Sequence, residues 1–254
     1  MNDTATVEHR PNHADAAALA FAAVFPSAAT WLYLDVLARH PSAAVQVAYG
    51  AEKVLQFAFP LIWVVLVRRQ KVHFPLALTP GSSPRRRGEL TGVKEGLALG
   101  LAVLAGTLLM YFWWLKPGRY LAGAAALIAT KATALGMGNP WRFVAGAVLL
   151  SSLHALLEEY YWRWFLFGGL RRFMPLPVAV AVSSLAFTAH HVILLASFFG
   201  GLTLPTVLFS LCVAVGGAAW AWIYHRSGSL LGPWLSHALI DAGIFVVGFD
   251  ILWR

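Results

Sequence analysis

The sequence has 254 residues, of which 59% are hydrophobic and only 12% are charged, and its mean hydropathy is +0.67. Soluble domains carry about twice that charged fraction, so the composition indicates a polytopic membrane protein and not a soluble one. The net charge of +8 does not indicate nucleic-acid binding, because the basic residues gather at the ends of apolar runs, as the positive-inside bias produces.

The N-terminal residues 1–15 are polar and mixed in charge. They lack the basic start and the small-residue cleavage site of a secretory signal, so we expect an uncleaved polar tail with the first apolar run retained as a helix. Cys212 is the only cysteine, which excludes an intrachain disulfide and a cysteine-based metal site.

Seven apolar runs are each long enough to cross a bilayer, because about 30 Å of hydrocarbon at about 1.5 Å per residue needs about 20 residues. Backbone groups in lipid must be paired within helices or a closed barrel, and these runs are too long for barrel strands. The sequence therefore predicts an all-α fold, a polytopic transmembrane helical bundle that forms one membrane domain. The runs lie near residues 16–37, 43–67, 93–115, 142–167, 176–199, 202–225 and 229–252.

Residues 68–90 form the most polar connector, which combines turn residues with six basic side chains. The positive-inside bias assigns this basic loop to the cytoplasm. We therefore expect a multi-pass protein of a bacterial-type cell membrane with a cytoplasmic N-terminus. Arg171 and Arg172 fall on the same side, which agrees, whereas Lys116 falls on the opposite side, which does not.

Glycines mark the start of the third apolar run and the segment that follows this run. Gly92, Gly96 and Gly100 follow at four-residue spacing, and such a stripe of small residues lets another helix approach closely. No strand precedes them, so they do not indicate a phosphate loop. Residues 117–140 place glycines around an alanine-rich stretch, which predicts a short interfacial or re-entrant helix.

The ionisable residues that carry chemistry concentrate in residues 141–252, whereas residues 16–140 form the N-terminal membrane helices. Glu158, Glu159 and Arg163 lie within six residues of one apolar run. Each ionised group at the centre of a bilayer costs at least about 2.5 to 3.5 kcal/mol on insertion scales, so the three indicate mutual compensation or a polar cavity. Because residues four apart share a helix face, Arg163 is expected to hold Glu159, while Glu158 points about 100° away and faces a cavity.

Histidines and an aspartate accompany these carboxylates. The same spacing puts His154 beside Glu158 on the fourth run and His237 beside Asp241 on the seventh. A structural role in a buried polar pair would explain any one of these groups. Burying the whole set on three separate spans costs free energy, which favours a functional role for the set. A carboxylate and imidazoles that converge on one water suit peptide-bond hydrolysis. The sequence has neither a Gly-x-Ser-x-Gly elbow nor a His-Glu-x-x-His motif, so a serine or zincin-type mechanism is unsupported.

Three ordered motifs on consecutive apolar segments resemble those of the CPBP intramembrane proteases, also called the Abi or CAAX prenyl protease 2-like family. The family patterns are Glu-Glu-x-x-x-Arg, Phe-x-x-x-His and His-x-x-x-Asn or a similar residue. The resemblance covers about residues 142–245. The matching segments are Glu158-Glu159-Tyr-Tyr-Trp-Arg163, Phe187-Thr-Ala-His-His191 and His237-Ala-Leu-Ile-Asp241.

The resemblance implies a membrane endopeptidase that cuts a protein or peptide substrate near its C-terminus or beside its membrane segment. In this sequence Glu158 would be the general base that activates water with His191. His237 and Asp241 would steady the oxyanion. The supporting residues are Glu159, Arg163, Phe187 and His190.

The residues leave open whether a metal takes part, because the family has been described both as glutamate-type and as metal-dependent. The glutamate-type mechanism needs no cofactor. The metalloprotease alternative needs a single divalent ion such as zinc, with oxygen and nitrogen ligands. Its ligands would be Glu158, His191, His237 and Asp241.

Two residues depart from the family pattern. Asp241 stands where Asn is frequent, and an ionised carboxylate would repel an oxyanion. It is therefore kept protonated by burial, orients His237, or binds the metal. Trp162 and Trp164 flank Arg163 where we expect Phe and Gly, and their bulk is expected to reshape the access of substrate to the site.

Two functions of other classes compete with proteolysis. A proton- or ion-coupled transporter could use the same polar groups, but transporters often show two corresponding halves, and here the polar groups lie in one half. A non-cleaving membrane scaffold or immunity protein could keep the residues and bind a partner. The substrate is equally open, since a prenylated tail, a bacteriocin-like leader and a C-terminal sorting helix all fit.

Overall fold

The computed structural model describes residues 12–37, 43–72, 75–76, 84–119, 121 and 125–254. All regular secondary structure in this part of the chain is helical, and seven of its helices are long and apolar enough to cross a membrane. The predicted all-α bundle of seven spans is thus confirmed. The seven spans are His13–Leu34, Ala44–Val67, Arg85–Leu115, Pro140–Leu170, Leu176–Phe199, Leu204–Ser227 and Leu231–Trp253.

Several spans change from α- to π-helical geometry along their length. The first three are α1 (His13–Trp31) with η1 (Leu32–Val36), α2 (Ala43–Ile62) with η3 (Trp63–Val67), and α3 (Pro84–Met110) with η4 (Tyr111–Leu115). The fourth comprises α5 (Pro140–Leu149), η6 (Leu150–His154), α6 (Ala155–Glu159), η7 (Tyr160–Phe167) and α7 (Gly168–Leu170). The last three are α8 (Leu176–Phe199), α9 (Leu204–Ser227) and α10 (Leu231–Trp253), and the short α4 (Ala125–Ala134) lies between the third and fourth spans.

The helix ends correct several predicted bounds. The first helix begins at His13, within the predicted tail 1–15, and Asn12 accepts a hydrogen bond from the backbone N–H of Asp15. Residues 1–11 of that tail lie outside the described residues. The predicted basic loop 68–90 is too long, because α3 already begins at Pro84, a residue suited to the first helical position. The third span has 31 residues, about 46 Å of helix, so it is longer than the hydrocarbon core is thick. The short helix predicted within residues 117–140 is α4.

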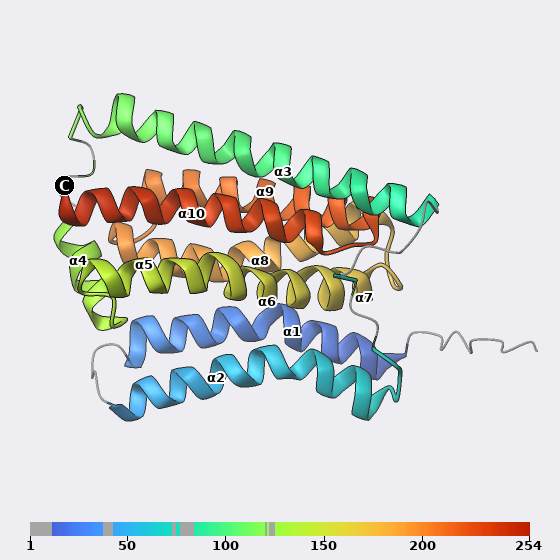
Figure 1. The fold of residues 1–254 in the computed structure, drawn as a ribbon. Helices are drawn as coiled ribbons and strands as arrows, with labels where there is room; N and C mark the ends of the chain where they lie inside the picture. The colour runs from blue at the N-terminus through green and yellow to red at the C-terminus, as the bar shows by residue number, and fades with distance from the viewer. Residues whose placement is uncertain (1–11, 38–42, 73–74, 77–83, 120, 122–124) are drawn as a thin grey trace, which may run out of the picture.

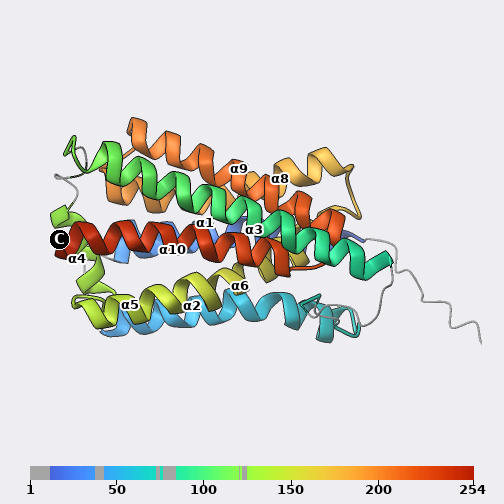
Figure 2. The ribbon, with the colours of Figure 1, turned by 45° about the horizontal axis from the view of Figure 1, so that its top comes forward.

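The fourth span contacts most of the other helices, because α10 packs along its first part and η7 contacts α1, α2, α8 and α9. In Figure 1 it lies between the pair formed by α1 and α2 and the group formed by α3, α8, α9 and α10. Figure 2 shows α3 running across α9 and α10, with both of which it is in contact. The described chain begins and ends at opposite ends of the bundle, as an odd number of spans requires.

The glycine stripe of α3 packs against α10, and this contact sets the position of the last span. An added methyl group at Gly96 would meet the backbone of Gly232, and one at Gly100 would lie 2.9 Å from the Cα of Ser236. The start of α10 is held from the other side as well, since the backbone N–H of Leu230 donates to the carbonyl oxygen of Pro75 (2.9 Å). These contacts place His237, one turn after Gly232, beside the fourth span.

This packing predicts opposite effects for two glycines of α3. Gly96→Ala should lower the free energy of unfolding by about 1 to 3 kcal/mol, because two backbones must move apart. Gly106→Ala is the matched control, since nothing lies within 4 Å of an added methyl group there, and it should leave stability unchanged or raise it by up to about 1 kcal/mol. Denaturant titration in detergent measures both. Equal effects of the two changes would contradict the proposed α3–α10 contact.

Candidate active site

The two adjacent glutamates lie in a short α-helical segment between two π-helical segments. Glu158 and Glu159 end α6, with η6 before them and η7 after them. Short π-helical stretches inside α-helices are frequent at functional sites, because they change which side chains share a face. The indole Nε1 of Trp234 on α10 donates to the carbonyl oxygen of Ser152 in η6 (2.8 Å), so α10 is tied to this irregular part of the span.

Glu159 joins the fourth span to α10. Its Oε1 lies 3.0 Å from Nη1 of Arg163 and 2.8 Å from Nδ1 of His237. All three side chains are buried, with exposed fractions of 0%, 2% and 5%. A carboxylate can only accept, so Nδ1 of His237 carries a proton and donates it to Glu159. The predicted Glu159–Arg163 pair is present, and it also fixes the orientation of His237.

Arg163 is surrounded by groups that favour its positive charge. Besides the ion pair, its Nη2 donates to the carbonyl oxygen of Gly217 (3.4 Å). The guanidinium carbon lies 4.6 Å from the ring centre of Phe187 and 4.9 Å from that of Trp220, within the range of cation–π interactions. Arg163 therefore connects the fourth span with α8 and α9 as well as with Glu159.

Glu158 is surrounded by imidazoles and makes no ion pair with arginine or lysine among the described residues. Its Oε1 lies 3.6 Å from Nε2 of His154 and 3.5 Å from Nε2 of His190, and its Oε2 lies 3.6 Å from Nε2 of His237. These distances exceed those of strong hydrogen bonds, and the side chain is only 8% exposed. Its oxygens thus remain able to accept a proton. Glu159 is thus paired with arginine, whereas Glu158 is bordered by imidazoles.

Aromatic rings fix the imidazoles next to Glu158. The ring of His190 is stacked on Trp162, with centroids 5.4 Å apart and an angle of 5° between the planes. The ring of His237 is stacked on Trp220 at 4.2 Å and 17°. Trp162, which departs from the family pattern, is 1% exposed and packs against a histidine of the cluster. The rigid rings leave the imidazoles few alternative positions.

His191 lies beside this cluster and outside the immediate contacts of Glu158. Its Nδ1 is 3.0 Å from the carbonyl oxygen of Phe187, so Nδ1 carries the proton and Nε2 is left as an acceptor. Its ring lies 4.1 Å from the ring of His190. Within the described part of the chain no carboxylate oxygen lies within 4 Å of a His191 nitrogen, so His190, one residue earlier, occupies the place next to Glu158 that was expected for His191.

Asp241 lies at the accessible side of the cluster. Its Oδ2 is 3.7 Å from Nε2 of His237, too far for a hydrogen bond, and its side chain is 24% exposed. His154 is 33% exposed, whereas Glu158 and His237 are nearly covered. The predicted pairing of His237 with Asp241 is present as a close contact, and Asp241 and His154 are more exposed than Glu158 and His237.

The described residues do not fit a metal centre. No group of three or more His, Cys, Asp or Glu side chains among them is arranged to hold an ion. The four ligands expected for zinc do not form such a group either. The metalloprotease alternative therefore has no support from this donor set, and the mechanism below uses the side chains alone.

The sequence did not point to several residues that support the site. Trp220 and Ser236 are hydrogen-bonded to each other (Nε1 to Oγ, 3.0 Å) and pack beneath His237, and Gly217 binds Arg163 through its carbonyl oxygen. Trp220 and Gly217 lie on α9, which carries none of the three motifs. Trp220 and Gly217 reach the cluster because α9 packs against α8 and η7. No local sequence pattern therefore predicts their place in the site.

Comparison with known proteins identifies the motif-bearing region. The family described as type II CAAX prenyl endopeptidase Rce1-like matches residues 140–243. This range includes all three motifs and confirms the family resemblance that they indicate. Neither a curated protein nor a solved structure matches the chain.

The buried ion pair predicts an asymmetric response to charge removal. Arg163→Gln should lower the free energy of unfolding by about 3 to 5 kcal/mol, because the carboxylate of Glu159 would remain buried without its arginine. The double change Glu159→Gln, Arg163→Gln should cost less than the sum of the single changes. Arg226→Gln is the control, since its pair with Glu95 is exposed and is worth less than about 1 kcal/mol. Denaturant titration in detergent would contradict this account if Arg163→Gln and Arg226→Gln were equally mild.

Proposed function

Residues 140–243 belong to the CAAX-type intramembrane protease family, and from that premise we propose that the protein is a multi-pass membrane endopeptidase with Glu158 as its general base. The observation that carries the proposal is the position of Glu158, a nearly buried carboxylate 3.5 to 3.6 Å from three imidazole nitrogens and separate from the Glu159–Arg163 pair. A base of this kind accelerates hydrolysis by about 10² to 10⁴.

The first step is the attack of water on the scissile carbonyl carbon. Glu158 accepts one proton of the water while the water oxygen forms the new bond to carbon. The Nε2 of His191 is an acceptor, because Nδ1 donates to Phe187, and it holds the second hydrogen of the same water. The product of this step is a tetrahedral intermediate with a negatively charged oxygen.

The second step is the breaking of the carbon–nitrogen bond. His237 is oriented by Glu159 through Nδ1, which leaves Nε2 to face the reacting group, and a proton on Nε2 stabilises the oxyanion. The proton taken up by Glu158 passes to the leaving nitrogen as the bond breaks. Glu158 returns to its ionised form, and the new amine and the new carboxylic acid leave the site, where the acid gives its remaining proton to water.

Asp241 acts through His237 in this mechanism. An ionised carboxylate in contact with an oxyanion would oppose the reaction, but the position of Asp241 near Nε2 of His237 suits an orienting role. Of the three roles open from the sequence, we therefore propose that Asp241 keeps the imidazole in place and favours the proton on Nε2.

The substrates are membrane-associated proteins or peptides cut near their C-terminus or beside a membrane segment. A site enclosed by helices of an integral membrane protein, with partly exposed groups at one side, favours a chain that is already anchored in the bilayer. The basic segment after the second span is proposed to face the cytoplasm, because positive charge gathers there, and the N-terminus, two spans earlier, is then on the same side.

The role of Glu158 is tested with the reconstituted full-length protein and a prenylated peptide that ends in a CAAX sequence. Glu158→Gln should slow release of the C-terminal fragment by about 10² to 10⁴, because the amide cannot accept the proton of the attacking water. Glu95→Gln is the matched control, since this glutamate pairs with Arg226 outside the site, and it should cut at the parental rate. Mass spectrometry of the fragment measures both. Cleavage by Glu158→Gln at the parental rate would refute the assignment.

A further inference from the structure

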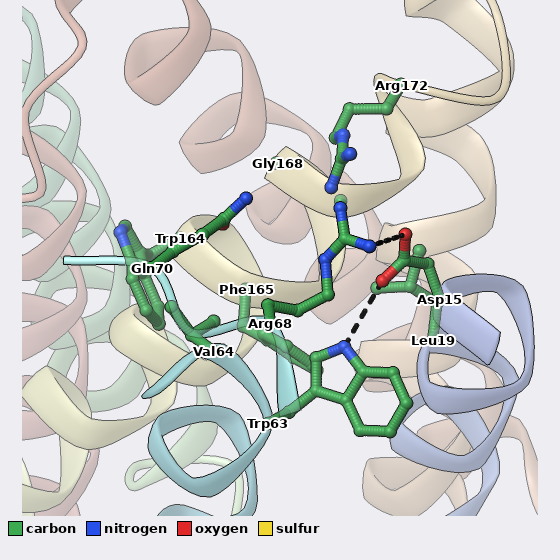
Figure 3. A pocket seen from close by; sticks show the side chains of 11 residues that line it. Asp15, Leu19, Trp63, Val64, Arg68, Gln70, Trp164, Phe165, Gly168 and Arg172 are labelled. Carbon is green, nitrogen blue, oxygen red and sulfur yellow. Dashed lines mark hydrogen bonds and ion pairs between the residues drawn. The ribbon is translucent and has the colours of Figure 1, made fainter. Parts of the chain in front are cut away.

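A cavity with charged side chains in its lining lies away from the carboxylate cluster, at the end of the bundle where the first span begins and the second and fourth spans end. Its volume is about 140 Å³. Figure 3 shows that Asp15 of α1, Arg68 after η3, Gly168 of α7 and Arg172 lie around it. The wall at Gly168 has no side chain, and an added methyl group there would touch only the carbonyl oxygen of Arg163, at 3.6 Å.

Arg68 is buried in this cavity with unused donors. Its Nη1 pairs with Oδ2 of Asp15 (3.1 Å), and its side chain is only 9% exposed. Its Nε and Nη2 are buried and have no hydrogen-bond partner among the described residues. A buried charged donor without a partner costs free energy of folding. The Nε and Nη2 groups of Arg68 can therefore bind a further hydrogen-bond acceptor favourably.

The described residues that line the cavity carry more positive than negative charge. Two guanidinium groups, of Arg68 and Arg172, and one carboxylate, of Asp15, line it, so the lining carries a net charge of +1. Figure 3 shows the guanidinium of Arg172 pointing toward that of Arg68. Asp15 is already engaged, because it also accepts from the indole Nε1 of Trp63 (3.4 Å) and from the backbone N–H of Asn12 (3.3 Å). An anion between the two guanidinium groups would balance this charge.

We propose that this cavity binds a phosphate group. Guanidinium groups bind phosphate oxygens through parallel N–H donors, and the cavity has room for one such group. It lies at the helix ends, where the phosphodiester groups of anionic lipids are concentrated, and basic sites between spanning helices bind such headgroups. A phosphate there links the start of the first span to the ends of the second and fourth spans. The group comes from a lipid headgroup or from free phosphate.

The proposal is tested on the full-length protein in non-ionic detergent by the temperature of unfolding. Phosphatidylglycerol, diacylglycerol without phosphate, and inorganic phosphate are titrated separately. Phosphatidylglycerol should raise the unfolding temperature saturably, and diacylglycerol should not. An effect of inorganic phosphate alone at the same site would identify free phosphate as the source, whereas its absence identifies the lipid headgroup.

Neighbouring arginines provide the matched variants. Arg172→Gln and Arg68→Gln should weaken the apparent affinity for the phosphate-bearing compound at least about tenfold, because each loses a charge-assisted hydrogen bond. Arg69→Gln removes the same charge from an exposed residue that does not line the cavity, and it should bind like the parental protein. Arg68→Gln also loses the ion pair with Asp15. If that variant fails to fold, the measurement on Arg172→Gln decides the test. The proposal is overturned if phosphatidylglycerol and diacylglycerol act alike, or if Arg69→Gln weakens binding as much as Arg172→Gln.

Discussion

The ion pair between Glu159 and Arg163 is the interaction on which the rest of the site depends. A carboxylate that is 0% exposed in an apolar bundle needs a compensating charge, and Arg163 supplies it at 3.0 Å. Since Glu159 also accepts the Nδ1 proton of His237, the pair orients the imidazole that faces Glu158. The neighbouring carboxylate of Glu158 has no arginine or lysine partner in the described structure, which suits its proposed role as a general base.

The fold brings these groups together from separate spans. The glycines of α3 let α10 approach so closely that Gly96 and Gly232 are in backbone contact, and this places His237 next to the fourth span. From the other side, α8 contributes His190 and Phe187, and α9 contributes Trp220 under His237. The packing of these helices thus determines which side chains lie next to Glu158.

The sequence predicted what depends on local spacing. The seven spans, the pair Glu159–Arg163 and the contacts of His154 with Glu158 and of His237 with Asp241 follow from run length and from helix periodicity. The choice between His190 and His191 beside Glu158 depends on the rotation of α8 against the fourth span, which adjacent residues in a sequence do not reveal. The π-helical turns and the support from Trp220 also arise from packing between spans, and no local motif encodes them.

The central claim is that the carboxylate of Glu158 makes this bundle a peptidase. Comparative proteomics of protein C-termini tests it most directly, in membranes that contain either the parental protein or Glu158→Gln at equal abundance. The account predicts that a set of new C-termini from membrane-associated proteins is present with the parental protein and is lost with Glu158→Gln. Identical C-termini in the two membranes, or a set that persists with Glu158→Gln, would contradict it.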